Sequence, residues 1–118
     1  MKSEPDSDPF GLPAGLSRKK FDDRIGAELP MLYSYFATWE SLGIMVQRRQ
    51  VSLELVCDFF SHSILQSWAV MESYVEELRR EMGRDTIWEW LQWLAERVKE
   101  QESLQKPIPA YVEFRAWK

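Results

Sequence analysis

The sequence predicts an all-α fold, a small bundle of three to four helices with an antiparallel helical hairpin (64–82 / 86–103) and extended N- and C-terminal tails. Three observations predict this class. Apolar residues recur at three- and four-residue spacing in four segments, and residues suited to cap helices lie between those segments. The composition, 45% hydrophobic and 29% charged over 118 residues, is typical of one globular domain.

The two ends of the chain differ from its middle. Residues 1–20 are rich in proline, glycine and acidic residues, which predicts a disordered or extended arm. Residues 17–28 allow a short lead-in helix, although Gly26 weakens it. The helical bundle is therefore expected over residues 21–106, and residues 107–118 form a separate tail.

The first firm helix is predicted over residues 30–48, because proline is well tolerated in a first helical turn and an apolar stripe follows it. Gly43 lies within the stripe, so we expect another helix to approach closely there. The stripe consists of Leu32, Tyr35, Phe36, Trp39, Leu42, Gly43 and Val46.

Three further helices are predicted after it. Ser52 is a suitable N-cap for a short helix over 53–60, and the serine-rich segment 61–63 is expected to break or bend the chain. A helix over 64–82 ends at Gly83, which suits a left-handed cap. Asp85 is predicted to cap the last helix, over 86–103, and the short turn between these two helices favours an antiparallel hairpin.

The tail contains several apolar residues, and we expect them to pack against another surface. Pro107 and Pro109 exclude a helix at its start, so an extended segment or a short terminal helix from Ala110 is expected. The apolar side chains of the tail are expected to pack either along the bundle or onto a partner.

Composition excludes several classes of function. A net charge of −4 and short basic clusters argue against nucleic-acid binding. No apolar run is long enough for a signal peptide or a membrane span, and peripheral membrane association is expected only through a partner. The single cysteine, Cys57, excludes an intrachain disulfide and fits a reducing compartment, so a cytoplasmic location is expected.

No residue pattern in the sequence predicts an enzyme, a metal site or a cofactor. Cys57 and His62 are five residues apart, but Cys57 lies on an apolar face, where a cysteine is usually a small buried hydrophobe. A di-metal bundle needs Glu-x-x-His motifs, and none occurs. Glu40, Glu72 and Glu89 border the apolar stripes, and we expect them in flanking salt bridges.

The aromatic residues point to a protein interface. Several large side chains lie off the main stripes or in the tail, and such residues are favoured at interfaces. The alternative is that the two tails of the chain cover them. The candidate partner-binding residues are Trp93, Tyr33, Met45, Tyr111, Phe114 and Trp117.

The expected function is therefore non-enzymatic protein–protein interaction, as a scaffold or accessory subunit. Two alternatives remain open at this point. One is a structural homodimer, in which the protein is its own partner. The other is a small-ligand binder or enzyme with a pocket between helices near Cys57, His62 and Trp68.

The helical segments as a set resemble an uncharacterised bacterial family of small helical proteins, a domain of unknown function. The resemblance covers residues 29–98 and implies an all-α fold and a bacterial source. Many members are tethered to a membrane by an N-terminal helix, which this sequence does not contain, and the family implies no catalytic residues. The segments that carry the resemblance are YFATWESLGIMVQRR from residue 35, LVCDFF from 55, ILQSW from 64, YVEELRR from 74 and WEWLQWLAER from 88.

Overall fold

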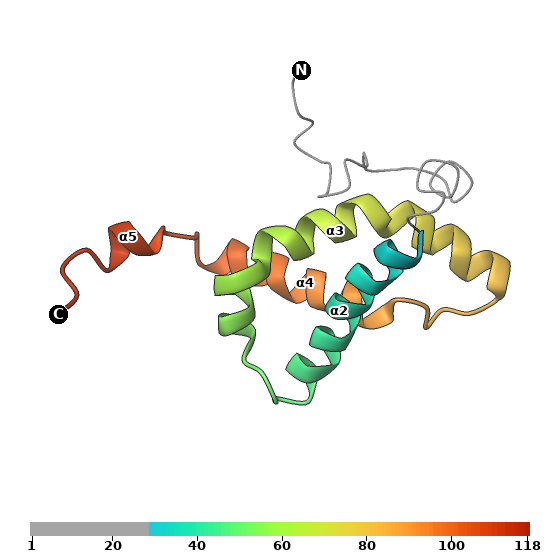
Figure 1. The fold of residues 1–118 in the computed structure, drawn as a ribbon, viewed down its shortest axis with the longest axis horizontal. Coiled ribbons are helices and arrows are strands. Elements are labelled where there is room, and N and C mark those ends of the chain that lie inside the picture. Colours follow the sequence, from blue (N-terminus) through green and yellow to red (C-terminus); the bar gives the residue numbers. More distant parts are fainter. Residues whose placement is uncertain (1–28) are drawn as a thin grey trace, which may run out of the picture.

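The computed structural model describes residues 29–118 (Figure 1), so the predictions for the arm and the lead-in helix lie outside the described residues. The described part contains three substantial helices and one short one: α2 (Leu29–Gln47), α3 (Leu53–Met82), α4 (Glu89–Leu104) and α5 (Ala110–Glu113). Residues 29–118 contain no strand, which confirms the all-α class. No helix within this range is both long and apolar enough to cross a bilayer.

α4 is the central helix of the bundle. It runs back along α3 as the predicted antiparallel hairpin, and α2 packs across it (Figure 1). The stripe of α2 supplies Leu32, Phe36 and Trp39 to the core, at the spacing that the sequence predicts. The remaining buried hydrophobic side chains come from α3 and α4: Val56, Ile64, Val70, Met71, Tyr74, Val75, Leu78, Leu91, Leu94, Ala95 and Val98.

Of the break or bend predicted at residues 61–63, the break is wrong, because α3 continues through this segment as one helix of 30 residues. The ribbon nevertheless bends in its green part (Figure 1). The hydroxyl of Ser67 donates a hydrogen bond of 2.6 Å to the carbonyl oxygen of Ser63. Such a bond to the preceding turn keeps a serine compatible with a helix and often bends it. The predicted caps are confirmed at both ends: Ser52 Oγ accepts from the Leu55 amide, and Gly83 is left-handed.

The predicted start of the last helix is also wrong. Asp85 is exposed and does not cap it, because residues 85–88 form turns and α4 begins at Glu89. The N-cap is Trp88, which has a left-handed φ of 56° and whose side chain makes no cap hydrogen bond. A bulky residue rarely adopts this conformation. The chain is held there from α3, since Arg79 Nε donates to the carbonyl oxygen of Ile87 at 2.9 Å and Arg79 Nη1 to Gln92 Oε1 at 2.7 Å.

The close approach predicted at Gly43 is confirmed. A Cβ added to Gly43 would collide with the carbonyl oxygen of Trp90 and would lie 3.0 Å from its carbonyl carbon. The obstacle is backbone in the first turn of α4 and cannot rotate away. Only a residue without a side chain therefore allows α2 to approach α4 this closely.

We expect Gly43→Ala to lower the free energy of unfolding by about 2 kcal/mol, because the new methyl group overpacks the contact with Trp90. This loss should appear even though alanine is intrinsically the better helix former by about 1 kcal/mol. Urea denaturation followed by circular dichroism measures the effect. Ser41→Ala, an exposed position on the same helix, is the control and should change stability by less than about 0.5 kcal/mol. A stabilised Gly43→Ala variant would contradict the close contact.

Candidate interaction surface

The candidate partner residues within the bundle are partly covered by the bundle itself. Tyr33 is half-buried, stacks on Trp88 with ring centroids 6.2 Å apart, and shares a 2.5 Å hydrogen bond with the hydroxyl of Tyr74. Trp93 is half-buried and packs edge-on against Trp90. Met45, on α2, is exposed. The role of these three residues in binding stays a prediction.

The tail presents its apolar side chains to solvent. Residues 105–118 are all exposed, and α5 lies apart from the bundle (Figure 1). The short helix from Ala110 is one of the two conformations that the sequence predicts. Tyr111 is 76% exposed and Trp117 80% exposed, so neither ring packs along the bundle. The exposed large apolar residues of the tail are Ile108, Tyr111, Val112, Phe114 and Trp117.

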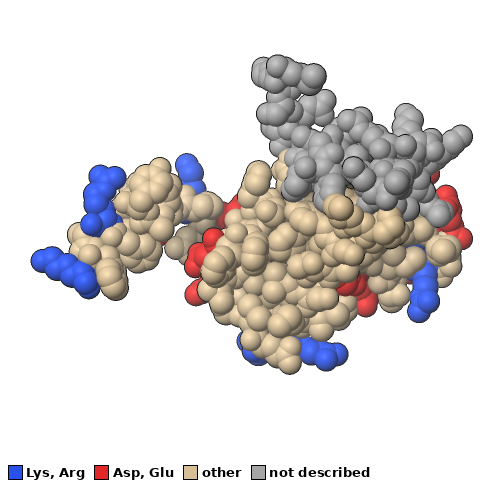
Figure 2. Space-filling model, viewed as in Figure 1, with Lys and Arg blue, Asp and Glu red and all other residues tan. Residues whose placement is uncertain are grey.

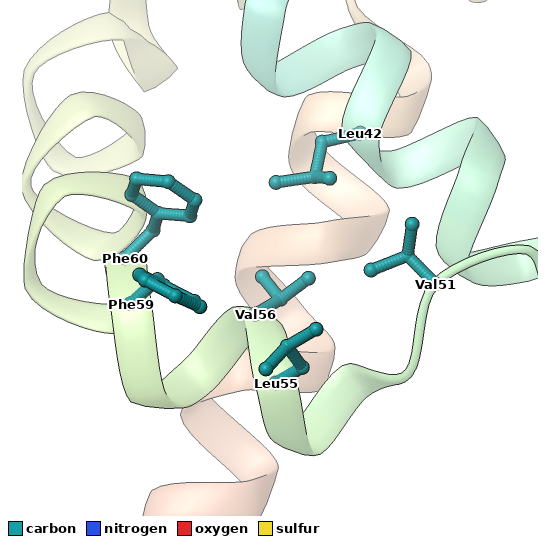
Figure 3. Close-up of a pocket in the computed structure, with 6 residues that line it drawn as sticks. All are labelled: Leu42, Val51, Leu55, Val56, Phe59 and Phe60. Carbon is teal, nitrogen blue, oxygen red and sulfur yellow. The ribbon is translucent and has the colours of Figure 1, made fainter.

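An open apolar hollow lies between the end of α2 and the start of α3. It has a volume of about 230 Å³ and is lined only by aliphatic and aromatic side chains. Figure 3 shows these side chains converging on one space from α2, from the loop before α3 and from the first turns of α3, with α4 behind them. The lining residues are Leu42, Val51, Leu55, Val56, Phe59 and Phe60.

The hollow differs from the pocket that the ligand-binding alternative requires. Its lining does not include Cys57, His62 or Trp68. Small-molecule sites usually measure roughly 300–1,000 Å³ and carry a few polar groups that orient the ligand. This hollow is smaller and has no polar lining residue, so it suits the insertion of an apolar side chain. Among the described residues, no cluster of three or more potential metal ligands occurs.

Acidic residues surround Cys57, which does not line the hollow. Burial raises the pKa of the Cys57 thiol, and the nearby carboxylates of Glu102, Asp58 and Glu54 raise it further. A thiol in such surroundings stays protonated at neutral pH and is a poor nucleophile. His62 is exposed. The electrostatics around Cys57 therefore do not activate its thiol.

Glu40 has a role that the sequence analysis missed. Its carboxylate reaches from α2 to the beginning of α4, where Oε1 accepts a hydrogen bond of 2.7 Å from the amide of Leu91. Burial raises the pKa of Glu40, and hydrogen bonds from the Leu91 and Trp90 amides oppose this rise. Glu40 thus satisfies amides that the N-cap residue, Trp88, leaves free. A carboxylate at a helix N-terminus also interacts favourably with the helix dipole.

The sequence pattern does not single out Leu55 and Phe59 as candidate site residues. Phe59 is 70% exposed and Leu55 is 49% exposed. A signal was present, because six of the eight residues from 53 to 60 are apolar. One buried face of a helix does not need that many, so the excess indicates a second apolar side.

Comparison with known proteins establishes the family. A family model, described as a domain of unknown function (DUF4760), matches residues 15–98. The match covers most of the chain, so the protein belongs to this family, as the resemblance of the helical segments predicts. No curated protein and no solved structure matches the chain.

We expect Glu40→Ala to lower the free energy of unfolding by about 1 kcal/mol, the usual effect of losing a helix N-cap. Chemical denaturation at pH 7 measures it. Glu72→Ala removes an exposed glutamate from α3 and should change stability by less than about 0.5 kcal/mol. Equal effects of the two substitutions would show that the contact between Glu40 and Leu91 contributes little.

Glu40 should also make stability depend on pH. Its pKa in the folded protein lies above the ordinary value of 4.5, so the folded state binds the proton more tightly than the unfolded state. The resulting stabilisation is fully present below pH 4.5 and is lost as the pH rises through the folded-state pKa. The stability of the wild type relative to Glu40→Gln should therefore fall as the pH rises from 4. Denaturation curves of both proteins at several pH values test this, and a relative gain with rising pH would contradict it.

Proposed function

We propose that this protein is a non-enzymatic interaction or scaffold subunit of the bacterial cytoplasm, and that its tail, residues 107–118, is the element that binds another protein. The observation that carries the proposal is the exposure of five large apolar side chains within these twelve residues. Water-exposed apolar clusters of this kind often mark interaction sites. The single cysteine is consistent with a reducing compartment.

The spacing within the tail supports a binding role. Ile108, Tyr111, Phe114 and Trp117 occur at every third position. Residues 110–113 form the helical turn α5, in which the amides of Glu113 and Phe114 donate to carbonyl oxygens four residues earlier, and the amides of Val112 and Trp117 donate to carbonyl oxygens three residues earlier. Side chains three residues apart lie on one side of such a turn. The tail can therefore bring several aromatic rings to one partner surface.

The aromatic residues of the tail are suited to supply binding energy. Tyrosine and tryptophan side chains are enriched among the interface residues that contribute most to affinity. They also bury a large area for the few rotatable bonds that binding immobilises. Because the tail rings are exposed in the free protein, most of their surface is available to be buried when a partner binds.

We expect the combined substitution of Tyr111, Phe114 and Trp117 by serine to leave the melting temperature unchanged, because these side chains are exposed. The same variant should lose partner binding by at least tenfold. Cross-linking in the native host, purification of the captured protein and titration with wild-type and variant protein measure this. Met31→Ser, an exposed apolar position on α2, is the control and should bind like the wild type.

Two results would contradict the proposal. One is partner binding by the serine variant with wild-type affinity. The other is binding of the wild type to anionic phospholipid vesicles without capture of any protein, which would make the basic, aromatic tail a membrane-surface element instead.

A further inference from the structure

The hollow between α2 and α3 lies beside a pair of basic residues. Val51 lines it from the loop, and Arg48 and Arg49 lie just before Val51 in the same loop. Both arginines are exposed, and neither forms an ion pair within residues 29–118. Figure 2 shows basic side chains (blue) at the edge of the bundle where Figure 1 draws this loop. The loop therefore presents positive charge next to an apolar surface.

The apolar surface beside these arginines is held in place by the core. Phe60, which lines the hollow, packs on the buried indole of Trp39, with ring centroids 5.3 Å apart. Leu55 and Phe59, which also line the hollow, remain exposed (Figure 3). An apolar side chain that enters the hollow therefore meets a preformed surface, which lowers the entropic cost of binding.

The N-terminal arm contains a segment whose chemistry matches this surface. Residues 3–17 include three acidic residues and no basic one, and Phe10 and Leu12 follow the last acid, Asp8. An acidic segment with an aromatic side chain offers opposite charge to the two arginines and a ring to the hollow. Such complementarity favours this segment over a neutral or basic one.

The other apolar segment of the chain, the tail, does not match the loop. It carries Arg115 and Lys118 against one acidic residue, Glu113. A tail docked in the hollow would bring like charge to Arg48 and Arg49, which disfavours the contact. The arm is therefore the better occupant of the two.

The chain that precedes the bundle is long enough to bring this segment to the hollow of the same molecule. It joins the bundle at Leu29, the first residue of α2, and Leu42 of the same helix lines the hollow. At the rise of an α-helix these two residues are about 20 Å apart. Residues 13–28, which connect the acidic segment to α2, can span roughly 50 Å when extended. Length therefore permits docking within one chain.

We propose that residues 4–12 of the arm dock at the hollow of their own chain, with Phe10 inserted in the hollow and the acidic side chains beside Arg48 and Arg49. This inference goes beyond the proposed function, because it concerns the other end of the chain and does not depend on the tail. The docked arm covers the apolar side chains exposed at the hollow and leaves the tail as the surface open to a partner.

Paramagnetic broadening of nuclear magnetic resonance signals in the full chain tests this docking. A nitroxide attached to Ala14→Cys, in a chain whose native cysteine is removed by Cys57→Ala, lies next to the docking segment. It should broaden the amide signals of Val51 and Leu55 and leave those of the tail sharp. The broadening should weaken as the salt concentration rises, because salt screens exposed charges.

Substitutions on the two sides of the apolar contact should remove the broadening. Phe10→Ser removes the inserted ring, and Leu16→Ser, an apolar position of the arm outside residues 4–12, is its control. Phe59→Asp adds a charge at the hollow, and Met82→Asp adds the same charge at an exposed position at the other end of α3. Both control variants should keep the broadening.

Charge reversal tests the role of the arginines. Arg48→Glu combined with Arg49→Glu should remove the broadening, whereas the same reversal at the exposed residues Arg84 and Lys99 should keep it.

A charge swap distinguishes docking from a general loss of structure. Asp6→Lys combined with Asp8→Lys should remove the broadening alone and restore it when the two loop arginines are also replaced by glutamate.

Three results would overturn the inference. The first is a nitroxide chain in which the signals of Val51 and Leu55 stay as sharp as those of the tail. The second is a Phe10→Ser variant that is broadened like its parent. The third is equal broadening in an isotope-labelled chain without nitroxide that is mixed with an unlabelled chain carrying it, because the arm of a second copy would then occupy the hollow.

Discussion

The fold depends on the contact between α2 and the first turn of α4. Glu40 and Gly43 lie three residues apart on one face of α2, and both meet this turn. Gly43 allows the two helices to approach until only a hydrogen atom fits against the carbonyl group of Trp90. At that separation the carboxylate of Glu40 reaches the amide of Leu91 and replaces the cap that α4 lacks. The hydrogen bond therefore depends on the close packing of the two helices.

The sequence predicts the features of the fold that have local causes. The stripe of α2, the left-handed cap at Gly83 and the close approach at Gly43 all follow from spacing and residue type. The start of α4 does not, because its cap comes from Glu40, nearly 50 residues earlier, whereas Asp85 satisfies the local pattern. The unbroken α3 also escapes prediction, because the helix accommodates the serine-rich segment and the carbonyl oxygen of Ser63 accepts a hydrogen bond from the hydroxyl of Ser67.

The candidate site, like the fold, can be predicted from sequence only in part. The sequence singles out the tail aromatics as candidates, because Pro107 and Pro109 separate them from the helical core, but it leaves open whether they pack along the bundle, and their exposure is seen only in the structure. The hollow cannot, because its lining comes from α2, a loop and α3, and its shape depends on how these elements pack. Tyr33 and Trp93 show the converse: both leave the main stripes, yet Trp88 and Trp90 from the same chain cover part of their rings.

The glycine contact also restricts how the bundle can be assembled. A slide of α2 by one helical turn along α4 would bring a residue such as Trp39 or Val46 to the place that Gly43 occupies against the Trp90 backbone. Neither side chain fits where a single methyl group already collides. A small helical domain with a repetitive apolar stripe is prone to alternative registers of similar energy. The missing side chain at Gly43 therefore disfavours registers of α2 that are displaced by one helical turn along α4.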